Sequence, residues 1–369
     1  MTDRVLIIGG RGRIGNSVAL DLAAHTQAQI TITGRDTAGI AANTPAPETE
    51  YLLLNLADKE ALQKAVAASN LVIHTAGPFH HRDASVLKTC IDEGVNYLDV
   101  SDSRSFTRRA LDYRDAAKNA GITAIINTGI FPGVSNSMVR RDVEQLDEAE
   151  RIHLSYVVGG SGGAGVTVMR TTFLGLQTPF EVWLDSKWKT VKPYSDRETV
   201  EFPEPYNKTG VYWFDMPESI TLPESFPVKT VITKFGTNPD LYNHLTWFVA
   251  NYWPDSWLKN NNVIEFLSRV SYAMTSFSNR FSGIGVAVRS EVTGIKNGHE
   301  AKVCSTVVHQ NAAEATGVGT GTIAQLILDG KLSQPGVWPV EQALSTALFE
   351  QAMESRGFKI EQELLTVNC

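Results

Sequence analysis

The stretch RVLIIGGRGRIGNSVALDLAAH, residues 4–25, decides how the first part of this chain folds. Residues 5–8 form a short and fully apolar run, which is typical of a strand buried on both faces of a parallel sheet. Gly10, Gly12 and Gly15 follow in the spacing G-x-G-x-x-G, and an amphipathic run continues from there. We therefore expect a strand, a glycine-rich turn and a helix, the beginning of a dinucleotide-binding βαβ unit.

Each glycine of this motif has its own physical role. The first allows the tight turn, the second lets a pyrophosphate approach the backbone, and the third lets the helix pack closely on the strand. The first N–H groups of the helix then point at the phosphates. Arg11, Arg13 and Ile14 lie in the same loop. We expect the whole segment from Gly10 to Gly15 to border the nucleotide.

The end of the second strand, expected at residues 30–33, indicates which nucleotide is bound. NAD-binding units usually carry an acid there, which accepts a hydrogen bond from the ribose 2′-OH. This chain has Gly34 instead, followed by Arg35, whose guanidinium suits a 2′-phosphate. Arg11 could close over the same phosphate, whereas Asp36 could accept from the 2′-OH. We favour NADP over NAD as the cofactor.

Strands and helices continue to alternate through the first third of the chain. Further strands are expected at residues 51–54, 71–75, 97–100 and 122–127. Six strands joined by crossovers of this length predict a doubly wound parallel Rossmann sheet, whose ligands bind beyond the carboxyl ends of the strands. Ala76, Gly77 and Pro78 follow the fourth strand, and we expect them near the nicotinamide half of the cofactor.

Three longer blocks of sequence carry a family resemblance. They read HTAGPFHHRDASVLKTCIDEGVNYLDVSDSRSF at 74–106, AKNAGITAIINTGIFPGVSN at 117–136 and ATGVGTGTIAQLILDGKLSQPGVWPVEQAL at 315–344. Together they resemble the saccharopine dehydrogenase/reductase-like family. The resemblance implies an NADP-binding Rossmann domain, a mixed α/β second domain and reductive amination-type chemistry on amino acids. It also implies that the C-terminal segment folds back onto the first domain.

Two domains are expected, because 369 residues exceed one comfortable core. The Rossmann domain would comprise residues 1–133 plus about 330–369, and a substrate-binding and dimerisation domain would span 134–329. Alternating apolar positions on either side of Asn297 and Gly298 predict a hairpin in the second domain. The expected fold class is α/β, a doubly wound parallel Rossmann sheet with a second mixed α/β domain containing a largely antiparallel sheet.

A reductase also needs a proton donor near the reacting bond, since the cofactor supplies only the hydride. Asp99 ends the fifth strand, Asp102 follows it, and His81 follows the fourth strand. These three are the candidate catalytic residues, for proton transfer or for orientation. For Asp99 a structural role is the alternative, in which its carboxylate only accepts hydrogen bonds from a neighbouring turn.

Composition excludes several classes of partner. The net charge is −7 and no basic run occurs, which argues against nucleic acid. The three cysteines are far apart, so neither a disulfide framework nor a metal site is expected. We see no signal peptide, and no apolar run reaches the ~20 residues that span a bilayer, so the cytoplasm is the expected location.

Residues 242–281 are unusually rich in aromatic side chains. One interpretation is a membrane-facing or lipid-binding patch. The other is a set of core helices with a subunit interface, where aromatic residues are also enriched. The polar side of this stretch is not rich in lysine, which favours the second interpretation and a homodimer over membrane association.

The sequence therefore predicts a cytoplasmic, NADP-dependent oxidoreductase. It would transfer a hydride to or from a C=N, C=O or activated C=C bond of a small, amino-acid-derived metabolite. Two alternatives remain open: a reductase that acts on a lipid-linked or isoprenoid substrate at a membrane surface, and a non-catalytic protein that senses NADP(H) through the same fold.

Overall fold

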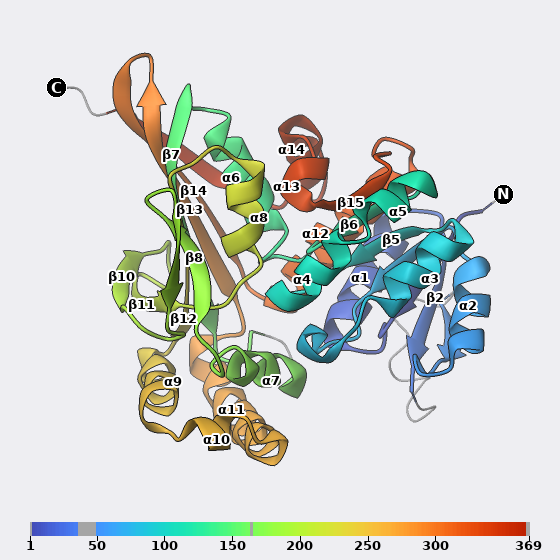
Figure 1. The fold of residues 1–369 in the computed structure, drawn as a ribbon, viewed down its shortest axis with the longest axis horizontal. Helices are drawn as coiled ribbons and strands as arrows, with labels where there is room; N and C mark the ends of the chain where they lie inside the picture. The colour runs from blue at the N-terminus through green and yellow to red at the C-terminus, as the bar shows by residue number, and fades with distance from the viewer. Residues whose placement is uncertain (1, 36–48, 163–164, 367–369) are drawn as a thin grey trace. The chain divides into compact units, whose positions relative to one another are not determined.

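The computed structural model describes residues 2–35, 49–162 and 165–366 of the chain. It divides into two compact units. Unit 1 comprises Met1–Val134 and Ala313–Leu348, and unit 2 comprises Ser135–Ala312 and Phe349–Cys369. Among the described residues, each unit is built on its own seven-stranded sheet, and Figure 1 labels many of the strands.

The sheet of unit 1 is parallel throughout, in the order β15-β6-β5-β4-β1-β2-β3. Its strands are β1 (Arg4–Ile8), β2 (Gln29–Gly34), β3 (Glu50–Leu53), β4 (Leu71–His74), β5 (Asn96–Asp99), β6 (Thr123–Ile126) and β15 (Gly336–Pro339). The direction of winding reverses between β1 and β4, and a nucleotide binds beyond the carboxyl ends of strands at such a point. The six strands expected from the sequence and the doubly wound fold are confirmed.

Helices of unit 1 begin and end at residues that the sequence marks. Asp58 starts α2 by accepting a hydrogen bond from the Ala61 N–H at 3.0 Å, and Gly94 ends α3 with φ +68°. The helices are α1 (Arg13–His25), α2 (Lys59–Ala67), η2 (Phe79–His81), α3 (Ser85–Glu93), α4 (Arg104–Leu111), α5 (Arg114–Asn119), α12 (Ala312–Leu328) and α13 (Val340–Ala343). From α13 the chain passes through α14 (Thr346–Ser355) into unit 2.

The sheet of unit 2 has the order β10-β11-β12-β7-β13-β14-β16. Its strands are β7 (Glu148–Gly159), β10 (Glu198–Glu201), β11 (Lys208–Trp213), β12 (Thr230–Asn238), β13 (Val286–Lys296), β14 (His299–His309) and β16 (Glu361–Thr366). Only β12 and β7 pair in parallel, so the sheet is largely antiparallel as predicted. Asn297 and Gly298, with φ of +51° and +78°, form the predicted hairpin turn.

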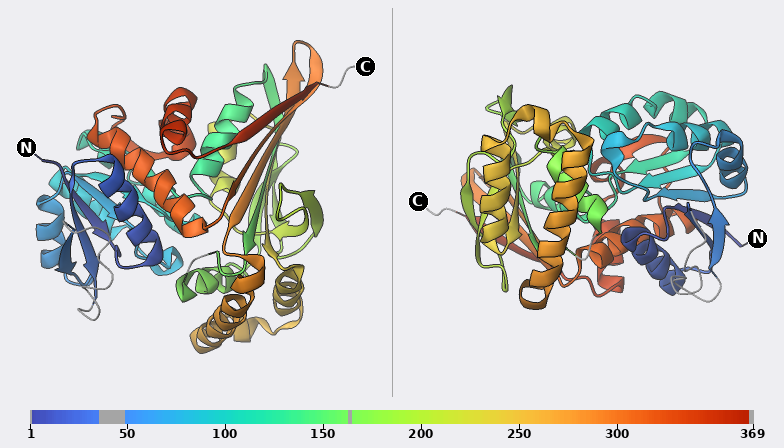
Figure 2. Two further views of the ribbon diagram at one scale, coloured as in Figure 1. Left: turned by 180° about the vertical axis from the view of Figure 1, so that it is seen from behind. Right: turned by 90° about the horizontal axis from the view of Figure 1, so that it is seen from below.

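The remaining elements of unit 2 are a two-stranded sheet and six helices among the described residues. They are β8 (Phe180–Leu184), β9 (Lys187–Val191), α6 (Val134–Val143), α7 (Val166–Leu174), α8 (Glu218–Ser225), α9 (Asp240–Tyr252), α10 (Asp255–Leu258) and α11 (Asn261–Ser282). Figure 2 shows the last three as a separate helical group at one end of the sheet.

The observed division differs from the expected domain bounds at the C-terminal end. Of residues 330–369, β15 joins the Rossmann sheet beside β6, but β16 pairs with β14 in unit 2. Helix α12, expected in the second domain, belongs to unit 1. Its glycines allow a close approach to α1, because a Cβ on Gly317 would lie 2.7 Å from Ser17 and one on Gly321 only 2.1 Å from the Asp21 carboxylate. Because glycines and not large apolar residues make these contacts, the sequence of α12 has no apolar periodicity from which its packing on α1 could be predicted.

Candidate dinucleotide site

The turn after β1 positions backbone N–H groups at the start of α1. Gly9 has φ +80°, a conformation that L side chains rarely adopt, and the Gly12 N–H donates to the Gly9 carbonyl at 2.9 Å. Gly9 is therefore the residue that makes the tight turn, a role that the sequence motif assigns to Gly10. The tight turn therefore lies one residue earlier than the motif predicts, and the G-x-G-x-x-G spacing itself is unchanged.

The three motif glycines differ in what a side chain would meet. A Cβ on Gly10 would lie 2.6 Å from Ile32, and one on Gly15 would lie 2.6 Å from the Gly10 Cα. At Gly12 the nearest atom is the Gly9 carbonyl oxygen, 3.2 Å away. Gly10 and Gly15 are therefore required by packing, whereas a Cβ on Gly12 would come close only to the Gly9 carbonyl oxygen among the described residues.

This open side of Gly12 fits a diphosphate. Gly12 is the N-cap of α1, it is exposed, and as a glycine it has no side chain with which to cap the helix. The first N–H groups of a helix lack partners within the helix, and they attract negative charge. Arg13, which is exposed, and Ile14, which is half-buried, form the first turn of the same helix.

At the end of β2, a side chain in place of Gly34 would meet two neighbouring side chains. A Cβ on Gly34 would lie 2.7 Å from both the Arg11 Cδ and the Tyr51 hydroxyl. The Arg11 guanidinium lies over the Tyr51 ring, 5.7 Å from its centre, a cation–π arrangement. Arg11 therefore lies beside the position at which NAD-binding units usually carry an acid. Asp36, the alternative acceptor, lies outside the described residues.

Arg82 is a further arginine near this site, and it could not be recognised from the sequence. Burial lowers the pKa of Arg82, and the charge of the exposed Arg35 lowers it further. The Arg82 Nε donates to the Ala76 carbonyl at 2.8 Å, which fixes it beside the turn after β4. Two guanidinium groups that repel each other are stabilised by an anion between them. No sequence motif marks Arg82, because its place depends on how η2 folds back.

The turn after β4 lies against the glycine turn. A Cβ on Gly9 would lie 2.9 Å from the Cα of Ala76, so the two backbones are in close contact. Gly77 and Pro78 continue the turn into η2, and both are half-buried. The structure thus brings together residues 76–78 and the G-x-G-x-x-G turn, although 60 residues or more of sequence separate them.

Asp99 is fully buried at the end of β5, and its contacts are those of a structural residue. Its Oδ1 accepts hydrogen bonds from the backbone N–H groups of Ser101 and Asn127, at 2.9 and 3.0 Å. Burial raises the pKa of Asp99 to about 6, although these two hydrogen bonds act in the opposite direction. The carboxylate connects the ends of β5 and β6, where Asn127 has a φ of +62°.

Asp102 and His81 retain contact with solvent. Asp102 is half-buried in the loop between β5 and α4, and burial raises its pKa to about 6. His81 is exposed at the end of η2, with its ring 5.5 Å from that of His80. Of the three candidate catalytic residues, Asp102 combines accessibility with a carboxyl group that titrates close to neutral pH, as a general acid requires.

His74, the last residue of β4, is a buried polar residue that the sequence analysis did not select. Its Nδ1 lies 3.3 Å from the Tyr97 hydroxyl, and its ring packs edge-on against Phe79 at 4.9 Å. Burial lowers the pKa of His74 to about 3, with the charge of Arg82 as the second cause. The ring is therefore neutral at physiological pH and supports the turn after β4 by packing.

The buried position of Asp99 gives a stability prediction. Asp99→Ala leaves two buried N–H groups without an acceptor and should lower the free energy of unfolding by about 2–4 kcal/mol. Asp99→Asn retains an acceptor oxygen and should be at least as stable as wild type at pH 7. Because folding raises this pKa from 3.8 to about 6, wild type loses stability as pH rises through that range, whereas the Asn variant does not. Urea denaturation at pH 4 and pH 7 measures both effects, and an Asn variant that is much less stable than wild type would contradict this assignment.

A hollow of about 160 Å³ in unit 2 contains none of the predicted site residues. Its lining is polar, and its groups contact each other: Arg289 pairs with Glu291 at 3.0 Å, and the His153 Nε2 lies 3.6 Å from a carboxylate oxygen of Glu198. We therefore do not assign it to the substrate. Among the described residues, no three His, Cys, Asp or Glu side chains gather in the way that a metal site requires.

The parallel sheet, its reversal between β1 and β4 and the glycine turn define unit 1 as a Rossmann dinucleotide-binding domain. Residues 5–125 match the family described as saccharopine dehydrogenase NADP binding domain. The resemblance noted in the sequence is confirmed: this segment is similar to the nucleotide-binding domain of the saccharopine dehydrogenase family, and the relatives that match over most of the chain support an oxidoreductase of that kind.

Characterised relatives match across both units. Carboxynorspermidine synthase from Vibrio cholerae is 26% identical over 337 residues, which cover 82% of this chain and 80% of the relative. Carboxyaminopropylagmatine dehydrogenase from a Synechocystis species is 23% identical over 375 residues, which cover 92% of each chain.

Solved structures show the same fold at low sequence identity. Apo saccharopine dehydrogenase (L-Glu forming) from Saccharomyces cerevisiae superposes with a TM-score of 0.72 at 15% identity, covering 98% of this chain and 100% of the other. Homospermidine synthase from Legionella pneumophila in complex with NAD gives 0.67 at 12% identity, covering 99% and 92%.

Proposed function

We propose that this protein is an NADP-dependent dehydrogenase that reduces a C=N bond between an amine and an amino-acid-derived, carboxyl-bearing partner, in the cytoplasm. The observation that carries the proposal is the match to carboxynorspermidine synthase, because it covers both units and not the nucleotide-binding domain alone. The second relative is likewise named for an amine that bears a carboxyl group. An alignment of this extent supports a shared reaction class more strongly than a shared fold does.

Several described residues support the proposal that the cofactor is NADP. Gly12 and the first N–H groups of α1 would hold the diphosphate, and Arg35 with Arg82 would hold the 2′-phosphate. Arg11 would border the adenosine, because it lies beside the position at which NAD-binding units usually carry an acid. When bound, the nicotinamide supplies the hydride for reduction or accepts it for oxidation.

The protein would contribute the proton that the substrate nitrogen takes up, and it would position the group that donates it. In the direction of reduction, the protonated Asp102 carboxyl donates to the substrate nitrogen, and in oxidation the carboxylate takes that proton back. Asp99 is a positioning residue, because it holds the backbone of Ser101 next to Asp102. His81 is the alternative donor, since it is exposed and follows the neighbouring strand.

Arg35→Ala tests the choice of cofactor. We expect the Kd for NADPH to rise 10- to 100-fold, about 1.4–3 kcal/mol, because a charge-assisted contact to the 2′-phosphate is lost. The Kd for NADH should change less than twofold, since NADH has no such phosphate. Isothermal titration calorimetry measures both constants. Arg108→Ala, which removes an exposed arginine on α4, is the matched control. Equal weakening of both nucleotides by Arg35→Ala would refute the preference for NADP.

A substrate panel tests the reaction. Purified enzyme and NADPH are mixed with pairs of a diamine or amino acid and a carbonyl-bearing carboxylic acid, and mass spectrometry identifies a reduced secondary amine. Ketones alone and activated alkenes are tested in parallel. Turnover restricted to either of these would overturn the C=N assignment. Tight NADPH binding without turnover of any class would instead favour the sensor.

A further inference from the structure

The helical group α9–α11 exposes its apolar side chains. Eleven large hydrophobic side chains in this part of unit 2 are between 37% and 82% exposed: Leu241, Leu245, Trp247, Phe248, Tyr252, Trp257, Phe266, Val270, Met274, Phe277 and Phe281. We call these eleven residues the aromatic patch. The Tyr242 hydroxyl donates to the Met274 carbonyl at 3.0 Å, so α9 and α11 lie side by side (Figure 2). These eleven side chains therefore do not lie in a core, and the subunit interface and the lipid-binding patch both remain predictions for them.

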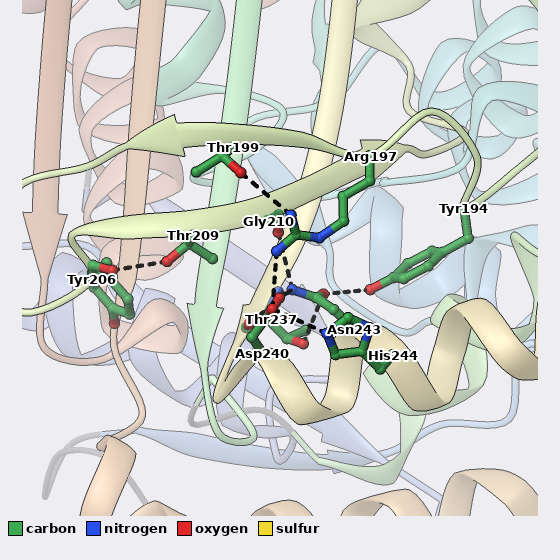
Figure 3. A network of polar contacts seen from close by, with 10 residues as sticks. All are labelled: Tyr194, Arg197, Thr199, Tyr206, Thr209, Gly210, Thr237, Asp240, Asn243 and His244. Atoms are coloured by element: carbon green, nitrogen blue, oxygen red, sulfur yellow. Dashed lines mark hydrogen bonds and ion pairs between the residues drawn. The ribbon is translucent and has the colours of Figure 1, made fainter.

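Polar residues fill the inward faces of both helices. On α9 the buried residue is Asn243, whose amide bonds to the Tyr194 hydroxyl, to Thr237 and to the Gly210 carbonyl, as Figure 3 shows. On α11 the buried residues other than Ile264 are Ser268, Thr275 and Ser278. Their hydroxyls donate to carbonyls of the preceding turn. A helix at the surface of a globular protein normally has the reverse arrangement, with its apolar face inward.

The outward face of α11 has the pattern of a helix that packs on another helix. Val263, Phe266, Val270, Ala273 and Phe277 follow one another at spacings of three and four residues, which is the a/d repeat of packed helices. Ala273 is exposed between larger neighbours and leaves a gap into which a side chain of a facing helix fits.

The size of the aromatic patch fits a dimer. Aromatic side chains carry about 150–250 Å² each, so the seven exposed ones amount to an area on the order of 800 Å². That exceeds the largest apolar patch of a typical monomer and equals the area that each partner buries in a standard protein interface. We propose that the aromatic patch is the contact surface with a second copy of this chain, related by two-fold symmetry.

Charge favours a second copy over a lipid surface. Residues 240–282 contain three acidic and three basic residues, so the segment is neutral within a chain of net charge −7. Helices that lie on membranes usually carry a lysine- and arginine-rich polar face, which is missing here. None of the helices in the described part of the chain is long and apolar enough to cross a bilayer. A neutral face meets its own copy without repulsion between like charges.

Sedimentation velocity between 1 and 50 μM tests the proposal. Wild type should have about twice the chain mass of 40.4 kDa, and the double variant Phe277→Glu/Phe281→Glu should be monomeric, with a dimer Kd raised at least 100-fold. Leu20→Glu, on the exposed side of α1 in unit 1, is the matched control and should remain dimeric. Circular dichroism and the melting temperature show whether each variant is folded.

Ala273→Phe separates a protein partner from a lipid partner without adding charge. It fills the gap and should weaken the dimer, whereas it should strengthen binding to a lipid surface. Flotation with phosphatidylcholine vesicles, with and without phosphatidylserine, measures that second quantity. Wild type that is monomeric at 50 μM would overturn the proposal, whether or not it binds vesicles. A dimer that is unaffected by both the charged and the uncharged variants would overturn it as well.

Discussion

Gly12→Val is expected to abolish binding of both NADPH and NADH while the protein stays folded. Among the residues that the structure describes, a Cβ at this position meets only the Gly9 carbonyl oxygen, at 3.2 Å. The backbone of Gly12 is extended, with φ −68° and ψ 159°, which valine readily adopts. The branched side chain would, however, occupy the space through which a diphosphate reaches the helix N–H groups. We expect at least a 100-fold rise in both Kd values, about 3 kcal/mol.

Gly15→Val is the control that separates packing from binding. Its Cβ would lie 2.6 Å from the Gly10 Cα and from the Thr75 hydroxyl, so this variant should lose stability as well as nucleotide. Calorimetry for binding and thermal unfolding for stability distinguish the two variants. Nucleotide affinity retained by a folded Gly12→Val protein would remove the basis for the proposed site.

Asp102→Asn should lower kcat by 10²- to 10⁴-fold, the range that a positioned general acid contributes. The amide has nearly the same shape but cannot give up a proton in the same way, so the Kd for NADPH should remain unchanged. Because burial raises the pKa of Asp102 to about 6, the reductive rate should fall as pH rises above 6 in wild type. The oxidative rate should rise through the same range, since it requires the carboxylate. Both pH dependences should be absent in the variant.

Two further variants make this result specific. Asp99 also has a pKa of about 6, so Asp99→Asn must retain the pH dependence if Asp102 is the donor. His81→Gln should reduce kcat only slightly. Loss of activity in His81→Gln together with normal activity in Asp102→Asn would identify His81, in η2, as the proton donor instead of Asp102. Steady-state kinetics between pH 5 and pH 9 in both directions supply these comparisons.

The strands of unit 1 could be predicted from the sequence because each is a short apolar run that ends at a glycine or a polar turn. The seventh strand, β15, could not be predicted in this way. Its sequence Gly-Val-Trp-Pro is brief and ends in proline, and it becomes a strand only by pairing with β6. Strand β16 likewise depends on its pairing with β14, which places it in unit 2.

The nucleotide site shows the same limit. The glycine spacing and Arg35 were visible, because they belong to one continuous βαβ unit. Gly9, Arg82 and His74 were not, because their importance arises from the turn after β4 folding against the turn after β1. Asp99 was visible as a candidate, but only its two backbone contacts indicate a positioning role.

The amino-acid sequence by itself determined the Rossmann topology, the glycine cradle and the amphipathic character of α11. Which face of α11 turns inward was decided only by the tertiary structure. Periodicity reports that a helix has two unlike faces, and it does not report what each face meets. Here the serine and threonine hydroxyls are satisfied within the helix, and Asn243 anchors the neighbouring α9 through hydrogen bonds. The apolar faces of α9 and α11 consequently face outward.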